Sequence, residues 1–207
     1  MRLALISDIH GNISGLEAVL AHLKKLGGFD TLYALGDIRG RIGTEAVLDL
    51  LIESNARMIR GNSEELLFDL ENLVGKTSDL SNARRNVEWC LANLSDAHLN
   101  LLRGLPIQEM VEIAPRHKIF LCHAAPNDVW SRTCEPTTPT ARLREAYGFL
   151  DAEIVAYGHY HGHHIISLDG KLLINVAGVG IGNGLSAFTL LEYDERWIIR
   201  QYQIPCI

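Results

Sequence analysis

Polar side chains of the kind that bind metals follow five short apolar runs of this sequence. The run at 3–7 leads into Asp8 and His10, and the run at 31–35 leads into Asp37. Alternate residues of an extended chain face the same side, so both members of an Asp-x-His or His-x-His pair can reach one site. Carboxylate, amide and imidazole groups all offer oxygen or nitrogen donors to divalent cations. The candidate ligands are Asp8, His10, Asp37, Asn62, His123, His159 and His161.

These donors converge if the strands before them share one edge of the fold. In open α/β sheets the carboxyl ends of the strands line a common crevice, where ligands bind. Each donor also has an ordinary explanation: an Asp after a strand can belong to a turn, Asn62 can cap the next helix, and His123 can be an interior histidine. Five such motifs in succession are hard to explain as caps, so the sequence predicts a metal site.

Alternating strand and helix patterns in the first half would position these donors. Ser14 and Glu17 have the spacing of a capping box at the start of a helix. Thr44 can cap a second helix over 45–54. Apolar spacing predicts further helical segments at 63–74 and 82–103, and short apolar runs predict strands at 3–7, 31–35 and 57–59.

The second half is typical of strands joined by turns. The Asp169–Gly170 pair marks a hairpin turn. The segment 123–139, with three prolines, is the candidate linker, but candidate ligands lie on both sides of it, so we expect a single domain over 1–207. Strands are expected at 118–122, 153–157, 164–168, 171–176, 187–194 and 197–204. The whole pattern predicts an α/β fold with two packed sheets and helices outside.

Composition narrows the functional classes. The chain has 207 residues, 47% of them hydrophobic, and a net charge of −6. A basic face supplies the affinity of nonspecific nucleic-acid binding, so the acidic balance gives no strong nucleic-acid signal. The cysteines lie far apart without a C-x-x-C pair, which argues against a cysteine-based zinc site. Without a signal peptide or a membrane span, we expect a cytoplasmic protein with no membrane partner, and a homo-oligomer stays open.

Five motifs together resemble the signature of the calcineurin-like metallophosphoesterases, in particular their small single-domain bacterial and archaeal phosphodiesterase-like members. The motifs are D-x-H at 8–10, G-D at 36–37, G-N at 61–62, His123 and G-H-x-H at 158–161. The resemblance implies the fold of that family, a two-sheet α/β/β/α sandwich. It also implies which residues share an ion. Asp8, His10 and His161 would hold one metal, Asn62, His123 and His159 would hold the other, and Asp37 would bridge them.

The resemblance further implies a phosphoesterase that uses two divalent ions. A metal-bridging hydroxide would attack a phosphodiester or nucleotide-type substrate in line, with Asp37 and Asn62 counted as catalytic. The mixed oxygen and nitrogen donors suit Mn²⁺, Fe²⁺, Ni²⁺ or Zn²⁺ without selecting among them. We expect a small phosphoester or nucleotide as the partner.

One position departs from the family pattern. Many members carry a histidine after G-N, and here that position is Ser63. A serine hydroxyl is far too weak an acid to replace an imidazolium near neutral pH, so diesters are favoured over monoesters. Candidate phosphate contacts are Asn12, Arg39 and Arg41, although Asn12 can equally cap a helix and the arginines can equally be solvated.

Two other functions compete with the phosphoesterase. The retromer subunit of this fold is a precedent for a protein-binding scaffold with altered catalytic positions, and intact donors at all seven positions argue against that role. A mononuclear zinc hydrolase is the weaker alternative, because it leaves the motifs of Asp37 and Asn62 unexplained.

Overall fold

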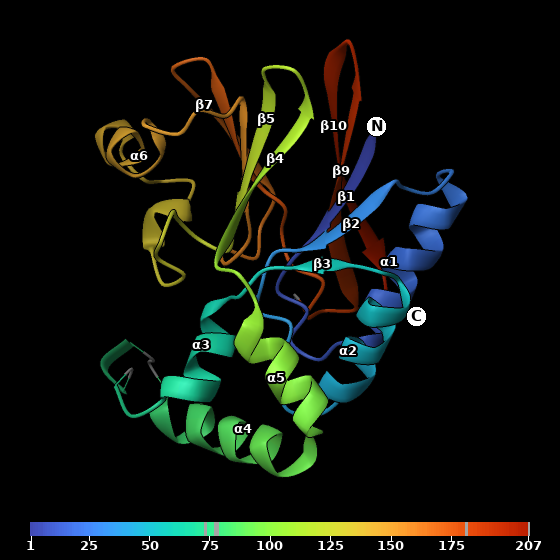
Figure 1. Cartoon of the computed structure of the whole chain (residues 1–207), viewed down its shortest axis with the longest axis vertical. Coiled ribbons are helices and arrows are strands. Elements are labelled where there is room, and N and C mark those ends of the chain that lie inside the picture. Colours follow the sequence, from blue (N-terminus) through green and yellow to red (C-terminus); the bar gives the residue numbers. More distant parts are fainter. Residues whose placement is uncertain (73, 77–78, 181, 207) are drawn as a thin grey trace.

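Two mixed five-stranded sheets form the centre of the computed structural model, which describes residues 1–72, 74–76, 79–180 and 182–206 (Figure 1). The first sheet has the strand order β10-β9-β1-β2-β3, and the second has the order β4-β5-β6-β8-β7. Strands β1 (Arg2–Ile6), β2 (Thr31–Ala34), β3 (Arg57–Met58), β9 (Leu185–Asp194) and β10 (Arg196–Pro205) build the first sheet. Strands β4 (Gln108–Ala114), β5 (His117–Cys122), β6 (Ile154–Tyr157), β7 (His164–Leu168) and β8 (Lys171–Asn175) build the second.

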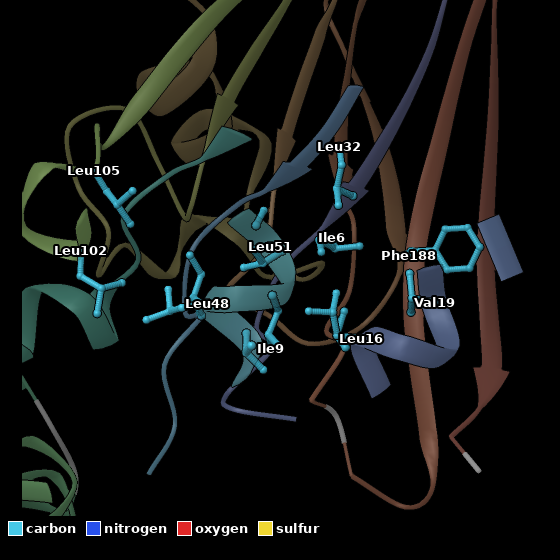
Figure 2. Close-up of a cluster of buried hydrophobic side chains, with 14 of the residues drawn as sticks. Ile6, Ile9, Leu16, Val19, Leu32, Leu48, Leu51, Leu102, Leu105 and Phe188 are labelled. Atoms are coloured by element: carbon cyan, nitrogen blue, oxygen red, sulfur yellow. The ribbon is translucent and has the colours of Figure 1, made fainter. Parts of the chain in front are cut away.

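The alternation of side chains along the strands produces the layers. On β1, Leu3 and Leu5 belong to the core between the two sheets, whereas Ala4 and Ile6 belong to the core under the helices. Successive side chains of a strand point to opposite faces, so both faces of a fully buried strand must be apolar. Figure 2 shows the helix-side cluster, in which Ile6 lies close to Leu16.

Helices cover the outer face of each sheet. On the first sheet they are α1 (Ile13–Lys25) and α2 (Thr44–Glu53). Helices α3 (Asn62–Asp69), α4 (Leu80–Asn93) and α5 (Asp96–Gly104) extend the same core cluster beyond the strand ends (Figure 1). The second sheet is covered by α6 (Thr140–Tyr147), whose Leu143 and Tyr147 pack against Val155 and Leu173. The predicted two-sheet α/β/β/α sandwich is therefore confirmed, while the single domain stays a prediction. Across the described ranges, no helix combines the length and the apolar character that a membrane span requires.

The predicted helix caps differ from those in the structure. The N-cap of helix α1 lies two residues before Ser14: it is Asn12, the alternative cap, which accepts a hydrogen bond from the amide of Gly15 at 3.0 Å. Ser14, the predicted cap, instead donates its hydroxyl to Asn12 Oδ1. Thr44 is the first residue of α2, and its hydroxyl accepts the amide of Gly40 rather than capping the helix.

Other elements were divided wrongly or missed. The predicted helix over 82–103 is two helices, because Ser95 caps α5 by accepting the amide of His98 at 3.2 Å. Strand β4 and helix α6 were not predicted, and the end of the predicted helix over 63–74 reaches residue 73, which lies outside the described residues. The hairpin turn was predicted well: Asp169 and Gly170 have φ values of 49° and 86°.

Candidate metal centre

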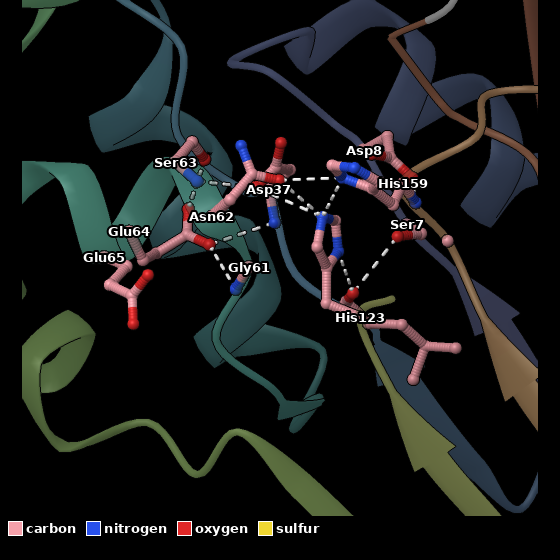
Figure 3. Close-up of polar contacts among 12 residues, drawn as sticks. Ser7, Asp8, Asp37, Gly61, Asn62, Ser63, Glu64, Glu65, His123 and His159 are labelled. Carbon is pink, nitrogen blue, oxygen red and sulfur yellow. Dashed lines mark hydrogen bonds and ion pairs between the residues drawn. The ribbon is translucent and has the colours of Figure 1, made fainter. Parts of the chain in front are cut away.

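All seven predicted donors lie together where five strands from both sheets end. Figure 3 shows Asp8, Asp37, Asn62, His123 and His159. Strands β1, β2 and β3 are parallel within the first sheet, and β5 is parallel to β6 in the second. Parallel neighbours present their carboxyl ends at one edge, so residues that are distant in sequence become neighbours there. The structure therefore brings all seven candidate donors together, while their role as metal ligands stays a prediction.

The loops that carry the donors have unusual backbone geometry. Asp8, His10, Asp37 and His159 all have positive φ, between 49° and 63°. This left-handed region is uncommon for residues with a side chain, and such conformations cluster at functional sites. Backbone hydrogen bonds of 3.0 Å join the loops, from the amide of Asp8 to the carbonyl of Gly36 and from the amide of His10 to the carbonyl of Asp37.

One group of donors combines a buried carboxylate with two partly exposed histidines. Nε2 of His161 lies 3.3 Å from Oδ1 of Asp8 and 3.3 Å from Nε2 of His10. Their donor atoms all fall within 4.8 Å of one another. A carboxylate and two imidazoles at this spacing can share one cation.

The second group is assembled around the amide of Asn62. Oδ1 of Asn62 lies 3.0 Å from Nε2 of His123 and 2.8 Å from Nδ1 of His159. The same two imidazole nitrogens are 3.2 Å apart. Asn62 is not the cap of α3, because the N-cap is Gly61, and the Asn62 side chain is directed into the centre (Figure 3).

Asp37 lies between the two groups. Its Oδ1 is 3.5 Å from Nε2 of His123, and its Oδ2 is 3.9 Å from Nε2 of His10. Oδ1 also accepts the amide of Ser63 at 2.8 Å, which fixes the orientation of the carboxylate. The two oxygens of one buried side chain therefore face different groups of donors.

His123 is held in one tautomer by the strand beneath it. Its Nδ1 donates to the carbonyl of Leu35 at 2.7 Å, and the hydroxyl of Ser7 donates to the same carbonyl at 3.2 Å. Because a proton stays on Nδ1, Nε2 is the nitrogen that offers a lone pair to the centre whenever the ring is neutral. Histidine ligands of metals typically donate the other ring nitrogen in this way.

The buried carboxylates are held in the ionised form. Burial alone would raise the pKa of Asp37, but His123 and His10 hold that pKa well below its usual range. Burial likewise opposes ionisation of Asp8, but the contact with His161 and the nearby His123 together lower the pKa of this carboxyl. Both carboxylates are therefore negative near neutral pH and available to a cation.

The pKa values of two of the histidines are shifted in opposite directions. The contact with Asp8 raises the pKa of His161, whereas burial lowers the pKa of His159, with His123 adding to the effect. A ligand histidine must be neutral. His159 therefore meets this condition readily, and His161 must lose a proton more often when a cation binds.

Sequence reasoning missed the role of Glu64, a fully buried residue of α3. Its Oε2 accepts the amides of Asp37 at 2.9 Å and Gly61 at 2.8 Å, and its Oε1 accepts the amides of Ile38 and Arg39, each at 3.0 Å. One carboxylate thus holds both the loop after β2 and the start of α3. In the sequence, Glu64 is only an acid in the first turn of a helix, where a negative charge is favourable because of the helix dipole.

Gly158 allows the loop after β6 to approach the centre. A Cβ at this position would lie 1.9 Å from Oγ of Ser7 and 2.5 Å from Oδ2 of Asp8. The same oxygen of Asp8 accepts the amide of His159 at 2.9 Å. Only a residue without a side chain permits this hydrogen bond, which explains the glycine before the first histidine of the motif.

The predicted phosphate contacts lie in different environments. Asn12 has its polar groups in use, since Oδ1 caps α1 and Nδ2 donates to the carbonyl of Val179 at 3.1 Å. Arg39 is buried and its Nε donates to the carbonyl of Ser63, whereas Arg41 is exposed. Both arginines line a pocket of about 520 Å³ that also includes His10 and Asp37. Phosphate binding stays a prediction for all three.

A second, smaller pocket borders the centre at His159. It has a volume of about 240 Å³ and is lined by Arg132, Glu135, His159 and Tyr160. Trp130, from the same loop, donates its indole N–H to Glu65 of α3. The segment after β5 is thus attached to the helix that carries Asn62.

The chemistry of the centre fits bound cations. Oδ1 of Asp8 is fully buried, and its contact with Nε2 of His161 at 3.3 Å lacks the geometry of a hydrogen bond. Two pairs of imidazole nitrogens, His10 with His161 and His123 with His159, face each other at 3.3 and 3.2 Å. Lone pairs that face each other at this distance repel unless a proton or a cation lies between them. A second carboxylate-rich group, made of Asp8, Asp37 and His123, also has its donor atoms within 4.8 Å.

Comparison with known proteins identifies relatives of the whole chain. A family sequence model described as the calcineurin-like phosphoesterase superfamily domain matches residues 1–196. An uncharacterized protein of Methanocaldococcus jannaschii is 25% identical over 202 residues, covering 95% of this chain and 73% of that protein.

Solved structures have the same fold. A hypothetical protein from Pyrococcus horikoshii OT3 gives a TM-score of 0.82 at 18% identity, covering 100% of this chain and 88% of that one. A metallophosphoesterase from Sphaerobacter thermophilus gives 0.72 at 20% identity, covering 100% and 90%. An archaeal phosphodiesterase gives 0.55 at 17% identity, covering 99% and 100%. Zinc-complexed Vps29 from Entamoeba histolytica gives 0.55 at 17% identity, covering 100% of both chains. Identities this low show the fold alone.

Proposed function

The chain belongs to the calcineurin-like phosphoesterase superfamily, and we propose that it is a metal-dependent phosphoesterase that hydrolyses phosphodiester or nucleotide-type substrates. The observation that carries this proposal is the position of Asp37. Its two carboxylate oxygens face His123 and His10, which belong to different groups of donors. A carboxylate in this position can hold two cations near each other, which is the arrangement that favours phosphoryl transfer to water.

We assign the seven donors to two divalent ions. Asp8, His10 and His161 would hold one ion, Asn62, His123 and His159 the other, and Asp37 both. When bound, Mn²⁺, Fe²⁺, Ni²⁺ or Zn²⁺ would supply Lewis acidity towards the phosphoryl oxygens and lower the pKa of the attacking water. The two carboxylates carry about two negative charges against about four positive ones, so the loaded centre attracts an anionic phosphoester in spite of the acidic chain.

Other residues of the chain would position the substrate. Arg41 is exposed beside the centre and can offer paired N–H donors to a phosphate. Arg39 is less free, because its Nε is already bonded to Ser63. Ser63 lines the same pocket and offers a hydroxyl where many relatives have an imidazole, so departure of the leaving group would receive little help from a general acid.

This proposal can be tested by activity after reconstitution with metal. The protein is loaded in turn with Mn²⁺, Ni²⁺ and Zn²⁺ and assayed on aryl diesters, aryl monoesters and dinucleoside polyphosphates. We expect turnover of a diester or a nucleotide-type substrate, and we expect Asp37→Asn to abolish it. The matched control is Asp194→Asn, which changes an exposed carboxylate at the end of β9 and should retain activity.

The alternative is a protein-binding scaffold on the same fold, a fold that zinc-complexed Vps29 from Entamoeba histolytica shares. A scaffold does not need intact donors. If the metal-loaded protein turns over none of the three substrate classes while binding metal normally, the phosphoesterase proposal is wrong and the scaffold becomes the better account.

A further inference from the structure

The pocket of about 520 Å³ is lined by candidate metal ligands at the centre and by other polar and apolar residues of α3 and α4. Its inner wall is formed by candidate ligands such as Asp37 and Asn62, and Arg39 and Arg41 stand next to them. Its outer wall belongs to α4, which is absent from the five-motif pattern. A pocket of this size is large enough for a small organic group in addition to a phosphate.

The α4 wall presents two carboxamides on one helical face. Asn82 and Asn86 are four residues apart, so their side chains lie one turn apart on the same side of the helix. Val87 and Cys90 of the same helix are buried in the core. The backbone amide of Asn82 donates to Oδ1 of Asp79, the N-cap, so the helix end is satisfied without either carboxamide.

Apolar surface lies beside these carboxamides. Leu66 from α3 and Ala83 from α4 both line the pocket. A flat ring can pack against such residues while its polar edge meets side-chain amides. Each carboxamide both donates and accepts hydrogen bonds, which is the property that lets asparagine recognise the edge of a base.

The charge of Asp79 limits what else can enter. Its carboxylate lines the pocket and accepts the amide of Asn82, so it lies beside the start of α4. A second phosphate placed there would meet a like charge. The outer pocket therefore suits an uncharged group better than a polyphosphate tail or a phosphorylated peptide with acidic neighbours.

We propose that this outer pocket binds the nucleoside part of the substrate, with the base against Leu66 and Ala83 and its edge hydrogen-bonded to Asn82 and Asn86. The proposal rests on the proposed phosphoesterase function, because the phosphate of the same molecule would lie at the metal centre. It makes the two asparagines specificity-determining residues and names nucleoside phosphodiesters as the substrate class.

The first test measures equilibrium binding instead of activity. The Mn²⁺-loaded protein is titrated by calorimetry with ribose 5-phosphate and with the 5′-monophosphates of adenosine, guanosine, cytidine and uridine. We expect at least one nucleotide to bind about fivefold or more tightly than ribose 5-phosphate, as contact with a base should provide. If all four bind no better than the sugar phosphate, the base has no site and the proposal is overturned.

Single substitutions then locate the site. Asn82→Ala and Asn86→Ala should each weaken the preferred nucleotide about three- to tenfold and leave ribose 5-phosphate unchanged. The matched control is Asn93→Ala, on the same helix, whose amide donates to the carbonyl of Trp89 and which should change neither ligand. Equal weakening of both ligands would show a merely structural role for the asparagines and would also overturn the proposal.

A kinetic experiment, which compares the hydrolysis of two diesters, tests this proposal separately from the phosphoesterase function. Methyl p-nitrophenyl phosphate is a diester without a nucleoside, and the p-nitrophenyl ester of the preferred nucleotide carries one. Hydrolysis of both esters with equal kcat/KM would support the phosphoesterase function and contradict the nucleoside-binding pocket. If neither is hydrolysed but the nucleotide binds through Asn82 and Asn86, the pocket stands and the hydrolytic function falls. If neither is hydrolysed and no nucleotide binds, both are wrong.

Discussion

The carboxylate of Glu64 accepts the backbone amide of Asp37 at 2.9 Å in the buried interior beside the metal centre. Three further amides converge on the same carboxylate. The side chain that lies between the two groups of donors is thus held by a residue that cannot itself reach a cation without giving up these bonds. Glu64 is a positioning residue, and its effect should be visible in metal affinity.

Replacing Glu64 with Gln tests this role. A carboxamide has only one accepting oxygen, so its NH₂ group would face backbone amides that are left without an acceptor, at about 1–3 kcal/mol for each. We expect lower thermal stability of the metal-free protein and weaker metal binding, measured by calorimetry. Glu45→Gln, an exposed acid in the first turn of α2, is the matched control. Equal behaviour of the two variants would contradict the positioning role.

Asp37→Ala should cause the largest loss of metal among single replacements of the seven donors. The reason is that Oδ1 and Oδ2 face His123 and His10 respectively, so both groups lose a ligand at once. Metal content after dialysis, determined by elemental analysis, checks this against His10→Ala and His123→Ala. A variant that keeps full metal content and near-normal turnover would show that Asp37 does not bridge.

The stabilisation that metal gives the fold should grow as pH rises. The contact with Asp8 raises the folded-state pKa of His161 above its unfolded value. In the metal-free protein, this contact therefore contributes stability that is complete below the unfolded pKa of about 6.5 and is lost as pH rises through the folded pKa. A cation needs the unprotonated ring, so metal affinity changes in the opposite direction.

The test is to measure melting temperatures of the metal-free and the Mn²⁺-loaded protein from below pH 6.5 to above the raised pKa of His161. The difference between the two melting temperatures at each pH is the stabilisation by metal. His161→Gln should flatten its pH dependence. A difference that is constant with pH in the wild-type protein would show that proton release from His161 does not accompany metal binding.

Ser63→His should restore help to poor leaving groups. The Ser63 side chain lines the pocket beside Asp37, and its hydroxyl donates to Glu64 at 3.1 Å, so a histidine there would start close to the reacting phosphate. A positioned general acid is worth about 10²–10⁴-fold, and less if its surroundings are unprepared. Rates for alkyl and activated aryl esters are compared at equal metal content. The alkyl esters should gain most, and an equal gain for both classes would mean that Ser63 does not mark a missing acid.

The sequence carried enough information to locate the donors because strand periodicity and position are local properties. Spacing alone did not single out His159 and His161, because His161 and His163 are spaced in the same way; the resemblance to the family motif G-H-x-H did. The convergence followed from the behaviour of parallel strands. The sandwich was predictable for the same reason, since buried strands such as β1 are apolar on both faces.

The parts that were missed depend on contacts between distant segments. Glu64 looked like an ordinary helix-start acid, because nothing local shows that the loop after Asp37 turns its amides toward it. Strand β4 is an edge strand, and half-exposed residues such as Glu109 and Val111 give it no clear apolar run. The break before α5 had a local signal, Ser95 followed by an acid, which the apolar spacing across it concealed.

The number of metal ions per chain tests the central claim most directly. The metal-free protein is titrated with Mn²⁺ or Zn²⁺, and bound metal is determined by elemental analysis for the wild type and for His123→Ala. We predict saturation at two equivalents in the wild type and the loss of one equivalent in the variant. Saturation of the wild type at one equivalent, with no loss in His123→Ala, would contradict the account.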